Sequence, residues 1–203
     1  MADNKKKLDG LKIGRFKLSF NAPVVLCFAL ISLGVLLLSY ISFGKIRDWL
    51  FMSYHASKFT LLTILRFFTH VLGHVGWDHF IGNMAYLLLL GPMLEEKYGS
   101  GKVLAVMMVT AFVTALINYL LFPQIAICGA SGVVFAMILM TSFTSFKEGE
   151  IPITFVLVAI IYLGKEIFDG IFMQDDISNL SHILGGIVGG IFGYLLNIKR
   201  KSN

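Results

Sequence analysis

Residues 103–146, VLAVMMVTAFVTALINYLLFPQIAICGASGVVFAMILMTSFTSF, contain no Asp, Glu, Lys or Arg in 44 consecutive positions. A membrane-spanning helix needs only about 20 apolar residues, so this run is too long for a single crossing. Phe122-Pro123 and then Gly129 mark the place where it breaks, because proline and glycine interrupt helices. The stretch therefore predicts two consecutive transmembrane helices with an uncharged connection between them.

The rest of the 203-residue chain has the same apolar character. Hydrophobic residues make up 57% of the chain and charged residues only 14%, and the mean hydropathy is +0.80. This composition excludes a disordered chain and argues against a soluble globular protein. The charge-free runs predict an all-α, polytopic membrane protein with six transmembrane helices, centred near residues 33, 86, 112, 138, 160 and 188.

The basic residues are distributed unevenly around these crossings. Twelve of the 17 Lys and Arg fall in the N-terminal arm, the second and fourth loops and the C-terminal tail. The positive-inside rule therefore predicts that both termini are cytoplasmic. The expected organisation is a basic arm at residues 1–22, a six-helix membrane domain at 23–198 and a basic tail at 199–203. Residues 45–78 are too polar to span and are expected to form an outer loop in the membrane interface.

The bilayer itself accounts for the net charge of +5, so no nucleic-acid partner is expected. No removable signal peptide and no organelle presequence is evident, which favours a bacterial cytoplasmic membrane. The oligomeric state is not predicted.

On this topology the second, fourth and sixth helices all begin near the outer face, and each begins with polar residues. These are His79 and Asn83, then Ser131, then His182. A serine at a helix N-terminus lies beside unpaired backbone N–H groups, which suit a nucleophile that must stabilise an oxyanion. His182 is the natural base for such a serine. Structural alternatives remain, because serine is also a common N-cap and an interfacial histidine can simply bond a carbonyl.

Small residues and one aromatic ring accompany this candidate pair. The supporting residues are Gly129, Gly132, Phe135, Gly185 and Gly189. Gly185 and Gly189 lie on the same helical face as His182, so the helix that carries the base is expected to pack closely on a neighbour. Phe135, one turn after Ser131, offers an aromatic surface for the imidazole.

Three further polar features complete the candidate site. His79 and Asn83 are one turn apart on one face, and both can donate hydrogen bonds to a developing oxyanion. His70 and His74 have the same spacing, but the residue between them that would make an HExxH motif is Val, so hydrogen bonding rather than metal binding is expected. No Asp or Glu is tied to His182, and the pattern therefore predicts a Ser–His dyad.

Taken in chain order, these motifs resemble those of the rhomboid intramembrane serine proteases. The matching elements are Arg66-Phe67-Phe68-Thr69-His70 with His74, the HxxxN element from His79 to Asn83, then Leu87, Gly91, Glu95 and Tyr98-Gly99, GxSG at residues 129–132, and HxxGxxxG from His182 to Gly189. The resemblance implies that Ser131 is the nucleophile and that His182 is the general base and then the general acid. It also implies an oxyanion hole made by His79, Asn83 and the Ser131 backbone N–H.

The same resemblance implies cleavage of transmembrane protein substrates in or beside their membrane spans, without a metal or cofactor. Three positions depart from the family's pattern. Leu65 stands where Trp usually precedes the arginine, Phe135 stands where many members have Tyr, and Ser181 stands where Ala is common. None of these departures removes a catalytic group.

Two other functions remain open from the sequence. A non-catalytic scaffold or chaperone would bind membrane helices in the same groove without cutting them. A transporter would use the intramembrane histidines as a proton path, but it would be expected to contain inverted repeats, and no convincing repeat is evident.

Overall fold

The computed structural model describes residues 12–13, 16–17, 20–144, 153–158, 160–161, 164 and 176–199. A short hairpin of β1 (Lys12–Ile13) and β2 (Phe16–Lys17) precedes the helices. The helices are α1 (Pro23–Ile41), α2 (Lys45–Leu50), α3 (Leu61–Thr69), the 3₁₀ turn η1 (His70–Leu72), α4 (Trp77–Tyr98), α5 (Ser100–Leu121), α6 (Ser131–Ser142) and α8 (Asp176–Lys199). The predicted helical fold is confirmed.

Five of the six predicted crossings coincide with helices of the structure, namely α1, α4, α5, α6 and α8. The long uncharged run breaks between Leu121 and Ser131, as predicted. The crossing expected near residue 160 lies largely outside the described residues, although 153–158, 160–161 and 164 are helical. Within the described residues, three helical stretches are long and apolar enough to cross a membrane: α1, α5 and residues 179–197 of α8.

The distribution of polar and apolar side chains is that of a protein surrounded by lipid. Ile41, Leu89 and Leu120 are between 65% and 76% exposed, and large apolar side chains are exposed along most of the described helices. Thr110 and Thr114, by contrast, are buried in the interior. Exposed apolar surface on this scale is unusual for a soluble monomer and is expected for helices that face hydrocarbon.

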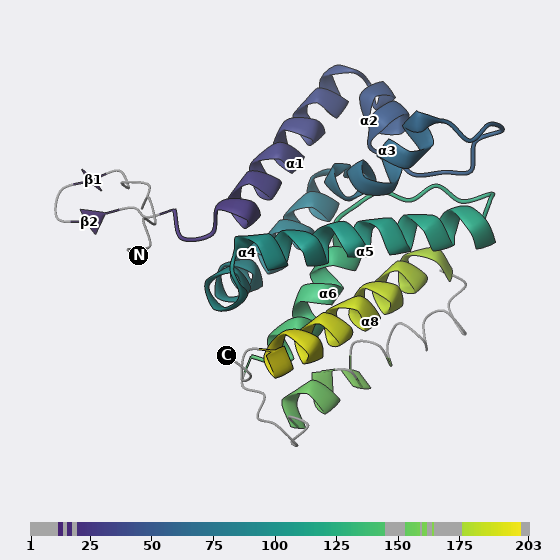
Figure 1. Ribbon diagram of the computed structural model, residues 1–203. Coiled ribbons are helices and arrows are strands. Elements are labelled where there is room, and N and C mark those ends of the chain that lie inside the picture. The colour runs from purple at the N-terminus through teal and green to yellow at the C-terminus, as the bar shows by residue number, and fades with distance from the viewer. Residues whose placement is uncertain are drawn as a thin grey trace, which may run out of the picture.

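Helix α6 is the centre of the bundle. It packs against α4, α5 and α8, and its residues 132–134 and 136–140 are buried. In Figure 1, α8 runs alongside α6 and α5, while α1 and α3 lie on the other side of α5. With 12 residues, α6 is about 18 Å long. Because the hydrocarbon core is about 30 Å thick, its two ends cannot both reach the membrane surfaces.

The N-terminus of α1 is capped by a carboxylate from another helix. Ala22, the N-cap residue, offers no side-chain acceptor. The buried Glu95 of α4 instead accepts hydrogen bonds from the backbone N–H groups of Val24 (3.0 Å) and Val25 (3.1 Å) and from the Ser100 hydroxyl (2.6 Å). A negative charge at the positive end of a helix dipole is favourable, so Glu95 joins α1, α4 and the start of α5.

Candidate active site

The connection between α5 and α6 is held by backbone hydrogen bonds to the segment that precedes α4. Ser53 and Ile127 exchange two N–H to carbonyl bonds of 2.9 and 2.8 Å. The Gly129 N–H donates to the His70 carbonyl at 2.9 Å. These bonds fix the approach to α6, because the chain on both sides of the turn is anchored.

Gly129 brings this connection against the ring of His79. Its φ is +122°, a conformation that side-chain-bearing residues rarely adopt. A Cβ atom at this position would lie 2.5 Å from Cε1 and 2.6 Å from Nε2 of His79. Only glycine fits, and its absent side chain is what lets the His79 imidazole contact the backbone two residues before Ser131.

Ser131, His79 and His182 line one cavity of about 480 Å³. The three residues come from the first turns of α6 and α4 and from the N-terminal part of α8. The other polar or small residues in its wall are His70, Thr114, Cys128, Gly129, Gly132 and Ser181, and the apolar ones are Met52, Val71, Val75, Ala126 and Ile127. Residues separated by more than a hundred positions in sequence therefore meet at one hollow.

Asn83 lies one turn beyond His79 on α4 and is not part of the cavity wall. Its side chain is buried, and its amide nitrogen has no hydrogen-bond partner among the residues that the structure describes. A buried N–H donor normally finds an acceptor. The Asn83 amide nitrogen is therefore an exception among the described residues, one turn along α4 from the cavity-lining His79.

The ring of His182 is stacked on Phe135. The ring centroids are 4.2 Å apart and the planes differ by 4°. Because Phe135 is one turn after Ser131 on α6, this contact orients the imidazole relative to the helix that carries the serine.

Backbone contact between α6 and α8 sets the position of His182. A Cβ on Gly185 would overlap the Gly132 carbonyl oxygen, and a Cβ on Gly189 would overlap that of Ala136. The two helices therefore touch without intervening side chains. Because Gly185 packs on Gly132, His182, one turn before Gly185, lies near the start of α6.

The two histidines that precede α4 are bonded to backbone carbonyls. His70 Nδ1 donates to the Arg66 carbonyl at 3.2 Å, and His70 Nε2 lies 3.5 Å from Thr114 Oγ1. His74 Nδ1 donates to the Leu72 carbonyl at 3.2 Å. Burial lowers the pKa of both imidazoles to about 4, so both are neutral at neutral pH. The described part of the chain contains no group of three His, Cys, Asp or Glu that could hold a metal ion.

Two polar residues of the cavity wall, Thr114 and Cys128, were not singled out by the sequence motifs. Thr114 belongs to a stripe with Thr110 and Asn118, spaced four residues apart and buried in an otherwise apolar helix. That spacing is a readable signal, because polar side chains on one face of a spanning helix point to an interior polar site. Cys128 carries no such pattern, and burial raises the pKa of its thiol to about 11.

Comparisons with known proteins identify the family of this chain. A family model for the Rhomboid domain matches residues 62–199. The chain is 27% identical over 144 residues to the rhomboid protease GlpG of Haemophilus influenzae, covering 69% of this chain and 73% of that one. It is 26% identical over 177 residues to the rhomboid protease GlpG of Pectobacterium atrosepticum, covering 85% and 62% respectively.

Rhomboid-related protein 1 of Caenorhabditis elegans is 26% identical over 140 residues, which cover 64% of this chain and 39% of that protein. The chain thus spans less than two thirds of the length of two of these three relatives. The domain match nevertheless includes α4, α5, α6 and α8, the helices that surround the cavity. This chain is a membrane protein that belongs to the rhomboid family.

Proposed function

We propose that this protein is an intramembrane serine endopeptidase that cleaves transmembrane segments of membrane proteins through a Ser131–His182 dyad. One observation carries the proposal. A serine at the start of the central helix, a histidine beside the close contact between α6 and α8, and a second histidine all line a single cavity in an apolar helical bundle.

The first half of the reaction is acyl transfer. The Ser131 Oγ attacks the scissile carbonyl carbon while His182 accepts the hydroxyl proton. The C–N bond then breaks, and His182 returns the proton to the leaving amine. Phe135, stacked on the imidazole, orients it in the role that a carboxylate has in a triad.

The negative charge that develops on the carbonyl oxygen needs donors. The Ser131 backbone N–H is the first of α6 and has no partner within the helix. The helix dipole favours negative charge at the same point. His79, against Gly129, and the Asn83 amide, which has no partner among the described residues, supply further donors from α4. Water then attacks the acyl-enzyme carbonyl, its proton passes through His182 to Ser131 Oγ, and the serine is regenerated.

The test is cleavage of a transmembrane reporter by the protein reconstituted in lipid. Ser131→Ala and His182→Ala are each expected to abolish cleavage while leaving expression and folding intact. Ser142→Ala, at the other end of the same helix, is the matched control and should keep wild-type activity. Ser131 should also be labelled by a serine-reactive phosphonate.

The same experiment separates the protease from the non-catalytic scaffold. A scaffold would bind the reporter in wild-type protein, leave it uncut, and fail to react with the phosphonate. Cleavage that persists in Ser131→Ala would remove that serine from the role of nucleophile.

The proposed setting is a bacterial cytoplasmic membrane. The chain crosses it six times with the 1–22 arm and the 199–203 tail in the cytoplasm, which places the cavity toward the outer face. The basic residues on the cytoplasmic side of that arrangement support it.

A further inference from the structure

A second, smaller cavity lies next to the catalytic one. Its volume is about 280 Å³, and it is lined by the end of α1, the helix α2 and the turn before α4. Its polar wall is formed by Ser39, Tyr40, Arg47 and His74. Val75 lines both cavities, so the two adjoin at this residue.

His74, one of the residues that line this cavity, carries an unsatisfied acceptor. The residue is completely buried. Its Nδ1 carries the proton, because that atom donates to the Leu72 carbonyl. In the neutral ring, Nε2 is then a lone-pair acceptor, and no donor bonds it among the described residues. Buried polar atoms are normally satisfied, so this atom points to a ligand.

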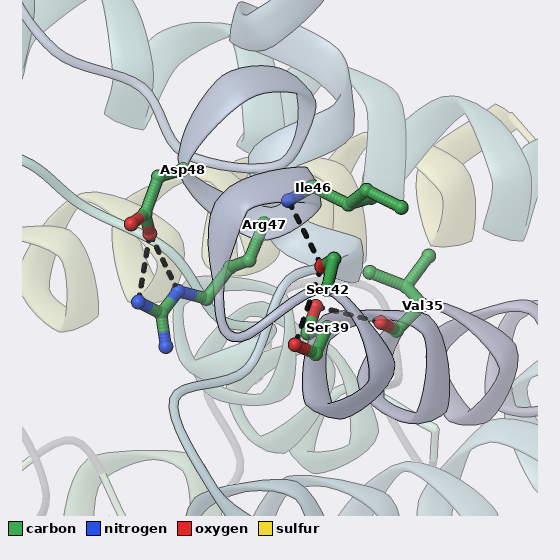
Figure 2. A network of polar contacts seen from close by, with 6 residues as sticks. All are labelled: Val35, Ser39, Ser42, Ile46, Arg47 and Asp48. Atoms are coloured by element: carbon green, nitrogen blue, oxygen red, sulfur yellow. Dashed lines mark hydrogen bonds and ion pairs between the residues drawn. The ribbon is translucent and has the colours of Figure 1, made fainter.

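The chemistry of the wall selects the ligand. The Ser39 hydroxyl uses its hydrogen on the Val35 carbonyl at 2.7 Å, which leaves its lone pairs to accept. Arg47 is paired with Asp48 through Nε (2.8 Å) and Nη2 (2.7 Å), as Figure 2 shows, and its other N–H groups remain donors. A fully deprotonated anion or a metal cation has no hydrogen to donate to His74 Nε2. Water both donates and accepts, and the space holds it easily.

His74 is also in contact with the proposed catalytic site. Its ring packs edge to face on His79, with centroids 5.1 Å apart and an interplanar angle of 67°. His79 in turn lies against Gly129. The orientation of His74 therefore bears on the orientation of a histidine that lines the catalytic cavity.

We propose that the second cavity holds a bound water that donates a hydrogen bond to His74 Nε2, and that His74, held in this way, is a positioning residue for His79. The second half rests on the proposed function, whereas the water site does not depend on it.

The water site is tested by a crystal structure of the full chain in a lipid phase. A water within roughly 2.6–3.2 Å of His74 Nε2 is expected. A dry cavity, or a protein donor bonded to Nε2, would overturn the water site regardless of whether the protein cuts a substrate.

The positioning role is tested with His74→Gln and His74→Phe. Glutamine can place an amide oxygen near the position of Nε2 and keep the water, whereas phenylalanine keeps the ring contact with His79 but has no acceptor. We expect roughly tenfold lower kcat in His74→Phe with KM unchanged, and substantial recovery in His74→Gln. If His74 acted only through packing, His74→Phe would keep a higher kcat than His74→Gln. That result would overturn the positioning role.

A third variant fills the cavity without altering either histidine. Ser39→Leu should expel the water and lower kcat as His74→Phe does. Leu37→Phe is the matched control: it adds bulk to α1 at an exposed position outside the cavity, and kcat should stay at the wild-type value. Normal kcat in Ser39→Leu, with the water gone, would refute the link to His79. If wild-type protein neither cuts the reporter nor reacts with the phosphonate, the proposed function fails, and the crystal structure still decides the water site.

Discussion

At the scale of single residues, the proposed oxyanion donors differ in how firmly they are held. His79 is confined between Gly129 and the ring of His74. Asn83 is buried, but its amide nitrogen has no partner within the described part of the chain. A donor with no competing acceptor can turn toward the developing charge at little cost.

Asn83→Ala is therefore expected to lower kcat by about a hundredfold, with a smaller effect on KM, because the backbone N–H and His79 still act. Steady-state cleavage of the reporter measures both constants. Asn197→Ala is the matched control, since that amide bonds Tyr98 and the Gly193 carbonyl near the C-terminal end of α8. Wild-type kcat in Asn83→Ala would exclude the asparagine from the oxyanion hole.

At the scale of elements, the helices are joined by a few specific contacts near their ends. Near one end of the bundle, Gly185 and Gly189 bring α8 onto the backbone of α6. Toward the opposite end of α4, Glu95 caps α1 and Lys97 donates to the carbonyl of Thr144 after α6. The stability of the bundle is therefore expected to respond to mutations far from the cavity.

Glu95→Ala should lower the free energy of unfolding by roughly 1–3 kcal/mol, since two backbone N–H groups and a hydroxyl lose their acceptor. Glu96→Ala is the neighbouring control, because Glu96 is exposed; its effect should stay within about 0.5 kcal/mol. Denaturant unfolding in detergent measures both. Equal stability of the two variants would contradict the capping role of Glu95.

The sequence predicts the long helices well and the short ones poorly. The 44-residue uncharged run, with Pro123 and Gly129 inside it, locates α5, α6 and the break between them. Residues 45–78, expected as an interfacial loop, instead contain α2 and α3. Helix α3 starts at a capping box made by Thr60 and Thr63, and a threonine in place of Glu or Gln makes that signal hard to recognise.

The candidate site likewise contains residues that the sequence predicts and residues that it misses. The motifs single out Ser131, His182 and His79, because each is expected near the start of a helix with an unusual polar residue. Ser131 is the first residue of α6 and His79 lies in the first turn of α4, but α8 begins at Asp176, six residues before His182, so the expected start of the last helix is wrong. The motifs do not identify Thr114 or the contact of His74 with the second cavity, since these depend on how α5 and α1 pack around the site. Tertiary neighbours of this kind have no local signature in one sequence.

At the scale of the whole molecule, two buried neutral histidines couple stability to pH. The ordinary pKa of the imidazole is 6.5, and burial lowers that of His70 and His74 to about 4 in the fold. Between these values the unfolded chain binds more protons than the folded one. The contribution of these two histidines to the free energy of unfolding is therefore fully present above about pH 6.5, and it is lost progressively as the pH falls toward 4.

Thermal unfolding in detergent should accordingly give a lower Tm at pH 5 than at pH 7.5. In His70→Gln one of the two titrating groups is gone, so the difference between the two pH values should shrink. A Tm that does not change with pH in wild-type protein would argue against neutral buried histidines.

The orientation of the whole chain is tested with reporter fusions. Green fluorescent protein fused after residue 203 should fluoresce, and alkaline phosphatase at the same point should be inactive, because the tail is proposed to be cytoplasmic. A fusion truncated after Lys58 should show the opposite pair of results. Active phosphatase on the full-length tail would reverse the proposed topology.

The short length of α6 has a consequence for the products of the proposed cleavage. If α6 ends at the cytoplasmic boundary of the hydrocarbon, its 12 residues lift Ser131 about 18 Å into a layer about 30 Å thick. Ser131, as the proposed nucleophile, would then meet a straight helical substrate roughly eight residues below its outer edge. Each cut would divide a span unequally, releasing a stub too short to stay anchored and leaving the longer piece embedded with its new end facing outward.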